Sequence, residues 1–400
     1  MRQGVLVCLL LSLLMITGAT AMSPETWKDT ARGSFSTLTA EEVDDVIEPY
    51  ITNGTYPGVV VVLADPDGYA CYAYGMRNRT TGESVDNRTT FEIGSVSKTF
   101  TGLLLADAEV RGLVSISSPV QLYLPDGIRA PSFDGRDITL SDISTHTSGI
   151  PGVPDDFYAY AREEDPAHDQ AESTFLAYGE MSAGAVYEWL NNLTLNRSPG
   201  DEWEYSNTGT AIVGDIVSRA EEETYPDLVR DRILDPLRMN STDARWNEEL
   251  RERAATGYRG YAPAFDEGRE IFFNDFWASA GGIVSDGDDM AVYLAAWLEL
   301  IETPFADALP LALEPRAIRS SDDDLWQSLF WDTVKTDDGT RIYLKAGETN
   351  RFQADVILIP ERQTGLVILA NTAYFIDNHV EYDIAVPLLK LILEKTHNEP

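Results

Sequence analysis

Short apolar segments bounded by turn residues make up the first part of the chain. Residues 39–42 read Thr-Ala-Glu-Glu, a capping-box pattern that predicts a helix extending to about Tyr50. An apolar run at 58–63 is followed by the turn sequence 65–68 and a second apolar run at 69–74. Two such runs around a tight turn predict a β-hairpin.

The pattern changes from strand-like to helical after a short extended segment at 91–94. Residues 95–111 have helical periodicity, and Gly112 provides the stop. Alternating and continuous apolar runs return near the C-terminus. There we expect helices at 286–300 and 382–394 and strands at 329–335, 341–345, 354–359 and 365–370.

The middle of the chain, residues 113–275, has many loop signals, scattered helical patches and few convincing strands. We expect this part to be an inserted, mostly helical domain. Strands at both ends of the chain predict one antiparallel sheet, flanked by helices and built from residues 22–112 and 276–400. The predicted fold class is therefore α/β in the broad sense (α+β).

Residues 1–21 have the features of a secretory signal peptide. Arg2 supplies a positive charge, residues 5–16 are apolar, and residues 19–21 read Ala-Thr-Ala. A membrane anchor is the alternative, but the apolar run is shorter than the ~20 residues that a spanning helix needs. We therefore expect an extracytoplasmic protein with no membrane association beyond the signal peptide.

The chain is strongly acidic, with 66 Asp and Glu residues, 30 Lys and Arg residues and a net charge of −36. Nucleic-acid binding needs a basic surface, so this composition excludes a nucleic-acid partner. Salt adaptation is one hypothesis for the imbalance, and codon bias is the alternative. No His-Glu-x-x-His spacing or similar ligand cluster occurs in the sequence, so we expect neither a metal nor another cofactor.

Ser95 and Lys98 are three residues apart at the start of the helix predicted at 95–111. Residues at this spacing project from one face of a helix, so the lysine amine can reach the serine hydroxyl. A desolvated lysine can take the proton of a serine and make it a nucleophile. Free N–H groups at the helix N-terminus can also stabilise an oxyanion. The alternative is a chance Ser-x-x-Lys on a solvated helix.

Tyr205 and Asn207 lie in a loop that leads into another predicted helix. A tyrosine hydroxyl becomes a credible proton acceptor when lysine cations stand beside it. The Asn207 amide can hold a substrate carbonyl or the amine of Lys98. An aromatic residue packed at the entrance of a helix is the alternative explanation for Tyr205.

Lys345, Ala346 and Gly347 end a predicted strand. The edge of such a strand can bind an extended substrate, and the backbone N–H of Glu348 can serve as a second oxyanion donor. Lys345 would lie next to Tyr205 and favour its anion. An exposed lysine on an edge strand is the alternative.

These motifs resemble the serine β-lactamase and penicillin-binding-protein family, most closely the class C β-lactamases and the related D-peptidases and esterases. The resemblance covers most of the chain after residue 21 and implies a β-lactamase/transpeptidase-like fold. It implies an acyl-enzyme on Ser95, with Lys98 and Tyr205 as the catalytic partners. Whether Lys98 or Tyr205 is the general base stays open at this point.

The sequence departs from the family at the third motif. Relatives have a threonine after the lysine that helps to hold the substrate carboxylate, whereas Ala346 has no hydroxyl. Glu348 adds an anion near the place where that carboxylate would lie. Both departures weaken the case for penicillins and cephalosporins and favour an ester, a D-peptide that presents an amine, or another neutral amide.

The sequence therefore predicts a secreted serine hydrolase that cleaves a small-molecule or peptide amide or ester. The catalytic residues would be Ser95, Lys98 and Tyr205, and the binding and oxyanion residues would be Asn207, Lys345, Gly347 and Glu348. A carboxylesterase is the first alternative. A penicillin-binding or sensor protein that acylates without turnover is the second.

Overall fold

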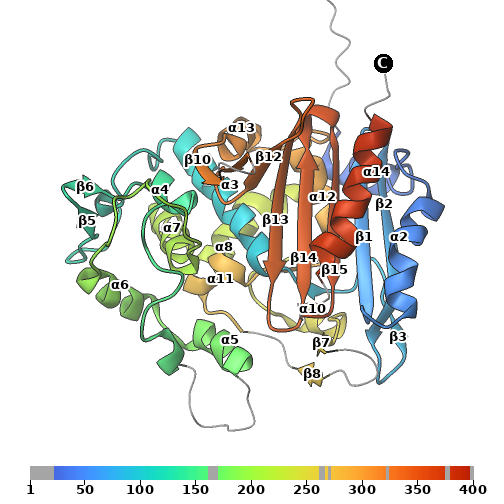
Figure 1. Ribbon diagram of the computed structural model, residues 1–400, viewed down its shortest axis with the longest axis horizontal. Coiled ribbons are helices and arrows are strands. Elements are labelled where there is room, and N and C mark those ends of the chain that lie inside the picture. The colour runs from blue at the N-terminus through green and yellow to red at the C-terminus, as the bar shows by residue number, and fades with distance from the viewer. Residues whose placement is uncertain are drawn as a thin grey trace, which may run out of the picture.

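The computed structural model describes residues 22–160, 170–260, 266–268, 272–320, 324–373 and 379–396 (Figure 1). The signal peptide predicted at 1–21 lies outside these residues. Within these ranges no helix combines the length and the apolar character needed to cross a membrane.

Within the described residues a nine-stranded sheet forms one side of the molecule, and all its neighbouring strands pair antiparallel (Figure 1). The N-terminal hairpin joins the C-terminal strands through the pairing of β1 with β15. The sheet predicted from both ends of the chain is thus confirmed. Its strands, in spatial order, are β10 (Ala317–Ser320), β11 (Leu325–Gln327), β12 (Asp332–Lys335), β13 (Arg341–Glu348), β14 (Gln353–Ile359), β15 (Thr364–Ala370), β1 (Gly58–Asp65), β2 (Gly68–Asn78) and β3 (Glu83–Ser84).

Helices cover both faces of this sheet and form most of the rest of the molecule (Figure 1). The α-helices are α1 (Pro24–Thr30), α2 (Ala40–Thr52), α3 (Ser97–Val110), α4 (Leu140–Ser144), α5 (Gln170–Glu180), α6 (Ala183–Asn192), α7 (Asn207–Ala220), α8 (Tyr225–Val229), α9 (Asp235–Leu237), α10 (Glu248–Glu252), α11 (Asp275–Gly281), α12 (Gly287–Trp297), α13 (Leu309–Leu313) and α14 (Val386–Thr396).

Shorter elements connect these helices and strands. The 3-10 turns are η1 (Gly94–Val96), η2 (Val120–Leu122), η3 (Phe157–Tyr160), η5 (Ala306–Ala308) and η6 (Pro360–Arg362), and the π-helical segments are η4 (Arg230–Leu234) and η7 (Glu381–Ala385). Two-stranded ribbons pair β4 (Phe91–Glu92) with β9 (Val284–Ser285), β5 (Ser132–Phe133) with β6 (Arg136–Asp137), and β7 (Gly257–Arg259) with β8 (Asp266–Gly268).

Strand β1 is apolar on both faces because a separate hydrophobic cluster covers each one. Val59 and Val61 face the cluster that includes Val43 of α2 and Leu388 of α14. Val60 faces the larger cluster, which includes side chains of α3 and α12. Since successive residues of a strand point to opposite sides, the continuous apolar run fits a sheet buried on both sides.

Helix α3 runs through the interior and places the predicted nucleophile at its start. All its residues from Ser97 to Ala108 are buried, which explains why most of them are apolar or small; Lys98 and Asp107 are the charged residues of this stretch. At Gly102 a Cβ atom would lie 2.5 Å from the carbonyl oxygen of Leu329, so only glycine allows the chain to pass so closely.

The strands β10 and β11 are missing from the sequence-based expectations. Each has only three or four residues, and Arg319 and Ser320 interrupt the apolar alternation in β10. The strand expected at 329–335 begins instead at Asp332, because Phe330 adopts a left-handed conformation with φ 61°. The helix expected from Ser95 begins at Ser97, after the 3-10 turn η1. The predicted fold class is confirmed, and the domain boundaries stay a prediction.

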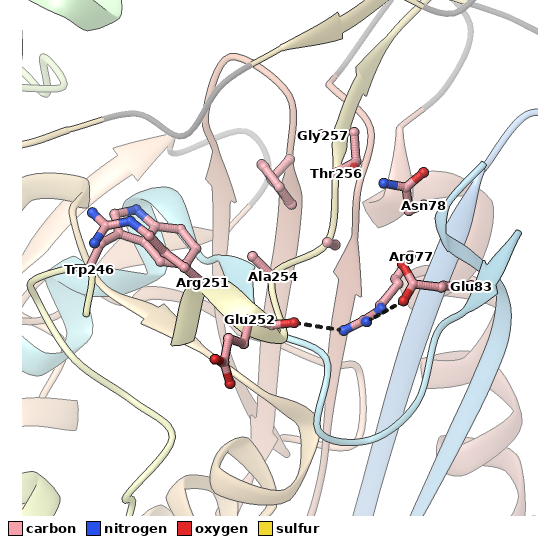
Figure 2. Close-up of a pocket in the computed structure, with 11 residues that line it drawn as sticks. Arg77, Asn78, Glu83, Trp246, Arg251, Glu252, Ala254, Thr256 and Gly257 are labelled. Carbon is pink, nitrogen blue, oxygen red and sulfur yellow. Dashed lines mark hydrogen bonds and ion pairs between the residues drawn. The ribbon is translucent and has the colours of Figure 1, made fainter. Parts of the chain in front are cut away.

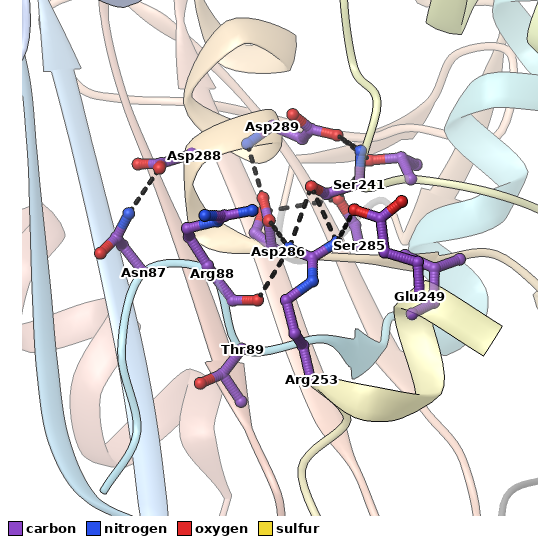
Figure 3. Close-up of polar contacts among 12 residues, drawn as sticks. Asn87, Arg88, Thr89, Ser241, Glu249, Arg253, Ser285, Asp286, Asp288 and Asp289 are labelled. Carbon is purple, nitrogen blue, oxygen red and sulfur yellow. Dashed lines mark hydrogen bonds and ion pairs between the residues drawn. The ribbon is translucent and has the colours of Figure 1, made fainter. Parts of the chain in front are cut away.

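A polar network fixes the start of α12 against the loops beside it (Figure 3). Asp286 caps the helix by accepting a hydrogen bond from the N–H of Asp289, and its carboxylate lies 3.3 Å from a guanidinium nitrogen of Arg253. Asp289 accepts hydrogen bonds from the N–H of Ser241 and from Lys28, both at 2.6 Å. Burial and the charge of Asp289 raise the pKa of Asp286 to about 7.

Candidate active site

Ser95 and Lys98 meet where the turn η1 leads into α3. Ser95 lies in the turn and Lys98 in the first turn of the helix. The Nζ atom of Lys98 is 3.1 Å from the Oγ atom of Ser95, which is hydrogen-bond distance. The spacing of three residues therefore brings amine and hydroxyl together as the sequence predicts.

Lys98 is completely buried and has three hydrogen-bond acceptors around its amine. In addition to Ser95, Nζ donates to Oδ1 of Asn207 at 2.7 Å and to the carbonyl oxygen of Ala280 at 2.5 Å. Burial, and then the positive charge of Lys345, hold the pKa of Lys98 well below its usual value. This environment favours a neutral amine, which keeps two hydrogens for Asn207 and Ala280 and has a lone pair that can accept the proton of Ser95.

Tyr205 completes the contacts of the serine from the loop before α7. Its hydroxyl donates to Oγ of Ser95 at 2.6 Å. The amines of Lys98 and Lys345 lie 4.8 and 4.9 Å from the centre of its ring. Burial nevertheless raises the pKa of Tyr205 above its usual value, so the hydroxyl is held as a neutral phenol that donates to the serine.

Asn207, the first residue of α7, is oriented from both ends of its amide. Its Oδ1 atom accepts from Lys98, and its Nδ2 atom donates to the hydroxyl of Tyr178 at 2.8 Å. The N-cap of α7 is Ser206, whose side chain accepts from the N–H of Gly209 at 2.8 Å. The cap fixes the start of the helix and with it the position of Asn207.

Two glycines allow β13 to run against the turn that carries Ser95. At Gly347 a Cβ atom would lie 2.1 Å from the carbonyl oxygen of Ile93 and 3.0 Å from the N atom of Ser95. At Gly94, where φ is +50°, a Cβ atom would lie 2.6 Å from the N atom of Glu348. The pairing of β12 with β13 ends at Leu344, which leaves this part of β13 next to the turn. The N–H of Glu348, expected to be one oxyanion donor, thus belongs to a segment in direct contact with the turn of Ser95, whose own N–H is placed to be the other.

Lys345 points from β13 toward Tyr205 and is itself buried. Burial lowers its pKa, the Asp332 carboxylate opposes this effect, and Arg319 adds to it. Arg319 forms an ion pair with Asp332 at 2.6 Å and lies 4.3 Å from the centre of the Trp203 ring. This side of the site therefore holds clustered cations beside the tyrosine.

His146 supports the loop of Tyr205, and its described contacts include this loop but not Ser95. It adopts a left-handed conformation with φ 59°, and its Nδ1 atom accepts from the N–H of Ser206 at 3.2 Å. Its ring centre lies 4.6 Å from that of Tyr205. Burial and the nearby cations hold the pKa of His146 well below its usual value. A neutral, buried histidine in this position packs the loop.

Ser95 stands between two hollows. A narrow one of about 30 Å³ is lined by the aromatic side chains of Phe175, Tyr178 and Phe273. A wider one of about 180 Å³ lies on the other side, along β13 and β14, and includes Glu348. A substrate whose scissile bond rests on Ser95 would extend into both.

A separate hollow of about 620 Å³ contains none of the predicted site residues (Figure 2). Figure 2 shows that Arg77 at its rim points toward Glu83 and toward the backbone of Glu252. The two contacts measure 2.9 and 3.2 Å. Arg77 is thus engaged by Glu83 and by a backbone carbonyl, and the residues that line this hollow do not form a serine, lysine and tyrosine grouping like that at Ser95.

Comparisons with known proteins identify the family. The family model described as Beta-lactamase matches residues 43–388, so the chain belongs to this family. A β-lactamase of Providencia stuartii is 26% identical over 364 residues, which cover 84% of this chain and 87% of the relative. The D-alanyl-D-alanine-carboxypeptidase/endopeptidase AmpH of Escherichia coli is 23% identical over 262 residues, which cover 64% of this chain and 63% of the relative.

Solved structures share the fold. A class C β-lactamase in complex with cefoxitin superposes with a TM-score of 0.73 at 23% identity, covering 88% of this chain and 98% of that one. A β-lactamase/D-alanine carboxypeptidase from Yersinia pestis has a TM-score of 0.73 at 20% identity and covers 90% of this chain and 98% of that one. The predicted family, the fold class and the class of enzyme, a serine hydrolase of this family, are confirmed.

The structure brings all seven predicted site residues to one region. Ser95, Lys98, Tyr205 and Asn207 are linked by hydrogen bonds, and Lys345 lies against the tyrosine ring. Three further groups were missed, namely the hydroxyl of Tyr178, the carbonyl of Ala280 and the carboxyl of Asp355. None of the three belongs to the motifs around Ser95, Tyr205 and Lys345, so local sequence did not select them.

Proposed function

We propose that the protein opens an amide or ester bond through an acyl-enzyme on Ser95. The observation that carries this proposal is the position of the Ser95 hydroxyl between two proton-transfer groups, 3.1 Å from Lys98 and 2.6 Å from Tyr205. The named activities of the relatives, β-lactamase and D-alanyl-D-alanine carboxypeptidase, both cleave amides. Small amides, peptides and esters are the substrate classes that follow.

Lys98 is the base in the proposed acylation step. The lowered pKa of Lys98 and the raised pKa of Tyr205 both favour a neutral amine and a neutral phenol. Oγ of Ser95 forms a bond to the substrate carbonyl carbon while its proton passes to Nζ of Lys98. The carbonyl oxygen becomes an oxyanion, which the N–H groups of Ser95 and Glu348 stabilise.

Tyr205 then serves as the acid. As the bond to the leaving group breaks, the tyrosine hydroxyl gives its proton to the departing nitrogen or oxygen. The amines of Lys98 and Lys345, 4.8 and 4.9 Å from the centre of the Tyr205 ring, would stabilise the phenolate left behind, and the protonated Lys98 can return the proton to it. Hydrolysis of the ester on Ser95 by water completes the cycle.

A carboxylesterase is the second candidate function, and the residues along β13 favour it. Ala346 lacks the hydroxyl that would help to hold a substrate carboxylate, and Glu348 lines both hollows beside Ser95. A neutral ester avoids the repulsion that a carboxylate would meet there. We also propose that the protein is located outside the cytoplasm, because residues 1–21 have the features of a signal peptide.

The test treats the protein without its first 21 residues, and its Ser95→Ala variant, with three probes. These are a fluorescent penicillin, a chromogenic cephalosporin and p-nitrophenyl acetate. Ser95-dependent hydrolysis of either amide or ester is the expected result, and Tyr205→Phe should lower kcat/KM by roughly 10²- to 10⁴-fold. Labelling without turnover would indicate a sensor, and ester cleavage alone an esterase. Absence of every Ser95-dependent reaction would overturn the proposal.

A further inference from the structure

The hollow of about 180 Å³ beside Ser95 lies on the face of the sheet opposite to Lys345. Side chains alternate along a strand, so Ala346 and Glu348 point away from the face that carries Lys345. Asp355 of β14 is the cross-strand partner of Ala346 and therefore points to the same side. Two carboxyl groups thus line a space that begins at the proposed nucleophile.

Asp355 is a buried carboxyl group, with only 5% of its surface exposed. None of the hydrogen bonds or ion pairs found in the part of the chain that the structure describes involves its side chain. Burial, and then the charge of Glu381, raise the pKa of Asp355 well above its usual value. A buried acid without a partner, aimed into a cavity, is costly unless a ligand supplies the missing contact.

Among the described residues that line this hollow there is no lysine or arginine. Lys345 points to the opposite face, toward Tyr205. His379, at the edge of the hollow, lies 4.0 Å from the carboxylate of Glu381, which is itself an acid. Gln353 accepts from the N–H of Val380 at 3.1 Å, and this bond holds the segment of His379 and Glu381 over the sheet. The electrostatic balance of the hollow is therefore acidic.

A metal ion does not suit the arrangement. Across the residues that the structure describes, no three His, Cys, Asp or Glu side chains are grouped as metal ligands. The hollow is also larger than a bare ion needs and opens directly at Ser95. An organic cation attached to a substrate would match both its charge and its size.

We propose that this hollow is a subsite for an ammonium group of the substrate, formed by Asp355 and Glu348. The proposal rests on the proposed function, since it places the ammonium on one side of the bond that Ser95 attacks. The aromatic hollow on the other side, with Phe175 and Phe273, would take an apolar group. The substrate class is then an amide or ester that carries an apolar group on one side and a protonated amine on the other.

The net charge of −36 favours the same class of substrate. A strongly acidic surface attracts cationic solutes and repels carboxylates over distances of about a Debye length. An ammonium that enters the hollow would stabilise the ionised form of Asp355 and exchange the unfavourable burial of a lone acid for an ion pair.

Binding to the Ser95→Ala variant tests the subsite without turnover. Three amides of phenylacetic acid serve as calorimetric probes: N-(2-aminoethyl)phenylacetamide is cationic, N-propylphenylacetamide is neutral and phenylacetyl-β-alanine is anionic. We expect the cationic probe to bind at least about tenfold more tightly than the neutral one, and the anionic probe to bind least. Equal affinities, a preference for the anion, or no binding of the cation would overturn the subsite.

Two substitutions in the Ser95→Ala protein locate the effect. Asp355→Asn and Glu348→Gln should each reduce the cationic preference at least about threefold. Asp337→Asn removes the same charge from an exposed turn between β12 and β13 and should leave the preference unchanged. Because Glu348 is exposed on the strand, Glu348→Gln keeps the test valid even where Asp355→Asn lowers stability. The proposal would be contradicted if Glu348→Gln kept the full preference for the cationic probe and Asp355→Asn either kept it as well or failed to fold.

A turnover measurement separates this inference from the proposed function. The neutral phenylacetyl thioester of 3-methylbutanethiol is given to the protein with Ser95 intact and to Ser95→Ala, and the released thiol is measured. Ser95-dependent release without any cationic preference in binding would support the acyl-enzyme and reject the ammonium subsite. A cationic preference without Ser95-dependent release would support the subsite and reject the acyl-enzyme.

Discussion

At the scale of single residues, the proposed chemistry depends on opposite changes in two pKa values. Burial disfavours the charged form of each group, so it lowers the pKa of Lys98 and raises that of Tyr205. Both side chains contact the Ser95 hydroxyl. The site thus holds a neutral base and a neutral acid on the same nucleophile, which is the pairing that acylation requires.

The pH dependence of kcat/KM on p-nitrophenyl acetate should reflect this arrangement. We expect activity to rise with pH as Lys98 loses its proton, with the midpoint well below the usual range of a lysine. Lys345→Met removes a cation that lowers the pKa of Lys98, so the acidic limb should move to higher pH. Lys335→Met, an exposed lysine of β12, is the control and should not move it. If the acidic limb of the kcat/KM profile had the same midpoint in Lys345→Met as in the parent, the role given to Lys98 would be contradicted.

The residues of the site differ in how far sequence could predict them. Ser95, Lys98 and Tyr205 occur in short motifs whose spacing carries their chemistry, so local sequence was sufficient to select them. Tyr178 and Asp355 join the site only through tertiary contacts with Asn207 and with the hollow beside β13. A lone tyrosine on a helix or a lone acid in a strand has no distinguishing local pattern.

At the scale of elements, β13 takes part in both the proposed catalysis and the proposed substrate choice. One face of the strand presents Lys345 to the tyrosine, while the other face presents Ala346 and Glu348 to the hollow. The predicted hairpin and the strands β13, β14 and β15 were correct because their apolar runs are long and bounded by turns. The short strand β10 could not be predicted, because tertiary pairing determines it.

Replacement of the two unusual residues of β13 should change the substrate preference. We expect the double variant Ala346→Thr with Glu348→Ser to hydrolyse a chromogenic cephalosporin roughly tenfold faster, because it restores a hydroxyl and removes a carboxylate that repels the substrate. The rate of each protein on p-nitrophenyl acetate serves as the reference, so that a general change in activity is not mistaken for a change in substrate preference. A double variant with no gain over the parent would count against this account of β13.

The start of α12 should make stability depend on pH. The pKa of Asp286 is raised to about 7 in the folded protein, above its value in the unfolded chain, so the folded state binds the extra proton. The stabilisation of the folded state by this extra proton is fully present below about pH 4 and is lost as the pH rises through 7. Over this range the free energy of unfolding falls by at most about 1.4 kcal/mol per pH unit.

We therefore expect the free energy of unfolding to fall between about pH 5 and about pH 8, and to fall less in Asp286→Asn. Asparagine keeps the helix cap, so the comparison isolates the ionisation of the carboxyl group. Denaturant unfolding at the two pH values gives the measurement, and Asp337→Asn is the control for loss of one charge. Equal slopes in Asp286→Asn and the parent would contradict the assignment.

At the scale of the whole molecule, the dominant feature is the excess of negative charge. The net charge of −36 opposes compaction of the chain, although ion pairs such as Lys28 with Asp289 and Arg319 with Asp332 offset part of it locally. The two hydrophobic clusters on either side of the sheet supply the opposing stabilisation. Salt that screens the repulsion should therefore stabilise the fold.

Salt adaptation predicts how stability and activity change together. Raising sodium chloride from about 0.05 M to about 2 M shortens the Debye length to a few ångströms, so we expect Tm to rise by roughly 3 °C or more. Near pH 4.5 many carboxylates are protonated, and the same addition of salt should raise Tm by about half as much or less. Hydrolysis of neutral p-nitrophenyl acetate should persist in about 2 M salt, because the base Lys98 is buried and contacts Ser95 directly, so salt screens this interaction weakly. A fall in Tm with salt at neutral pH, or a steep loss of this activity, would mean that the acidic composition is not an adaptation to salt.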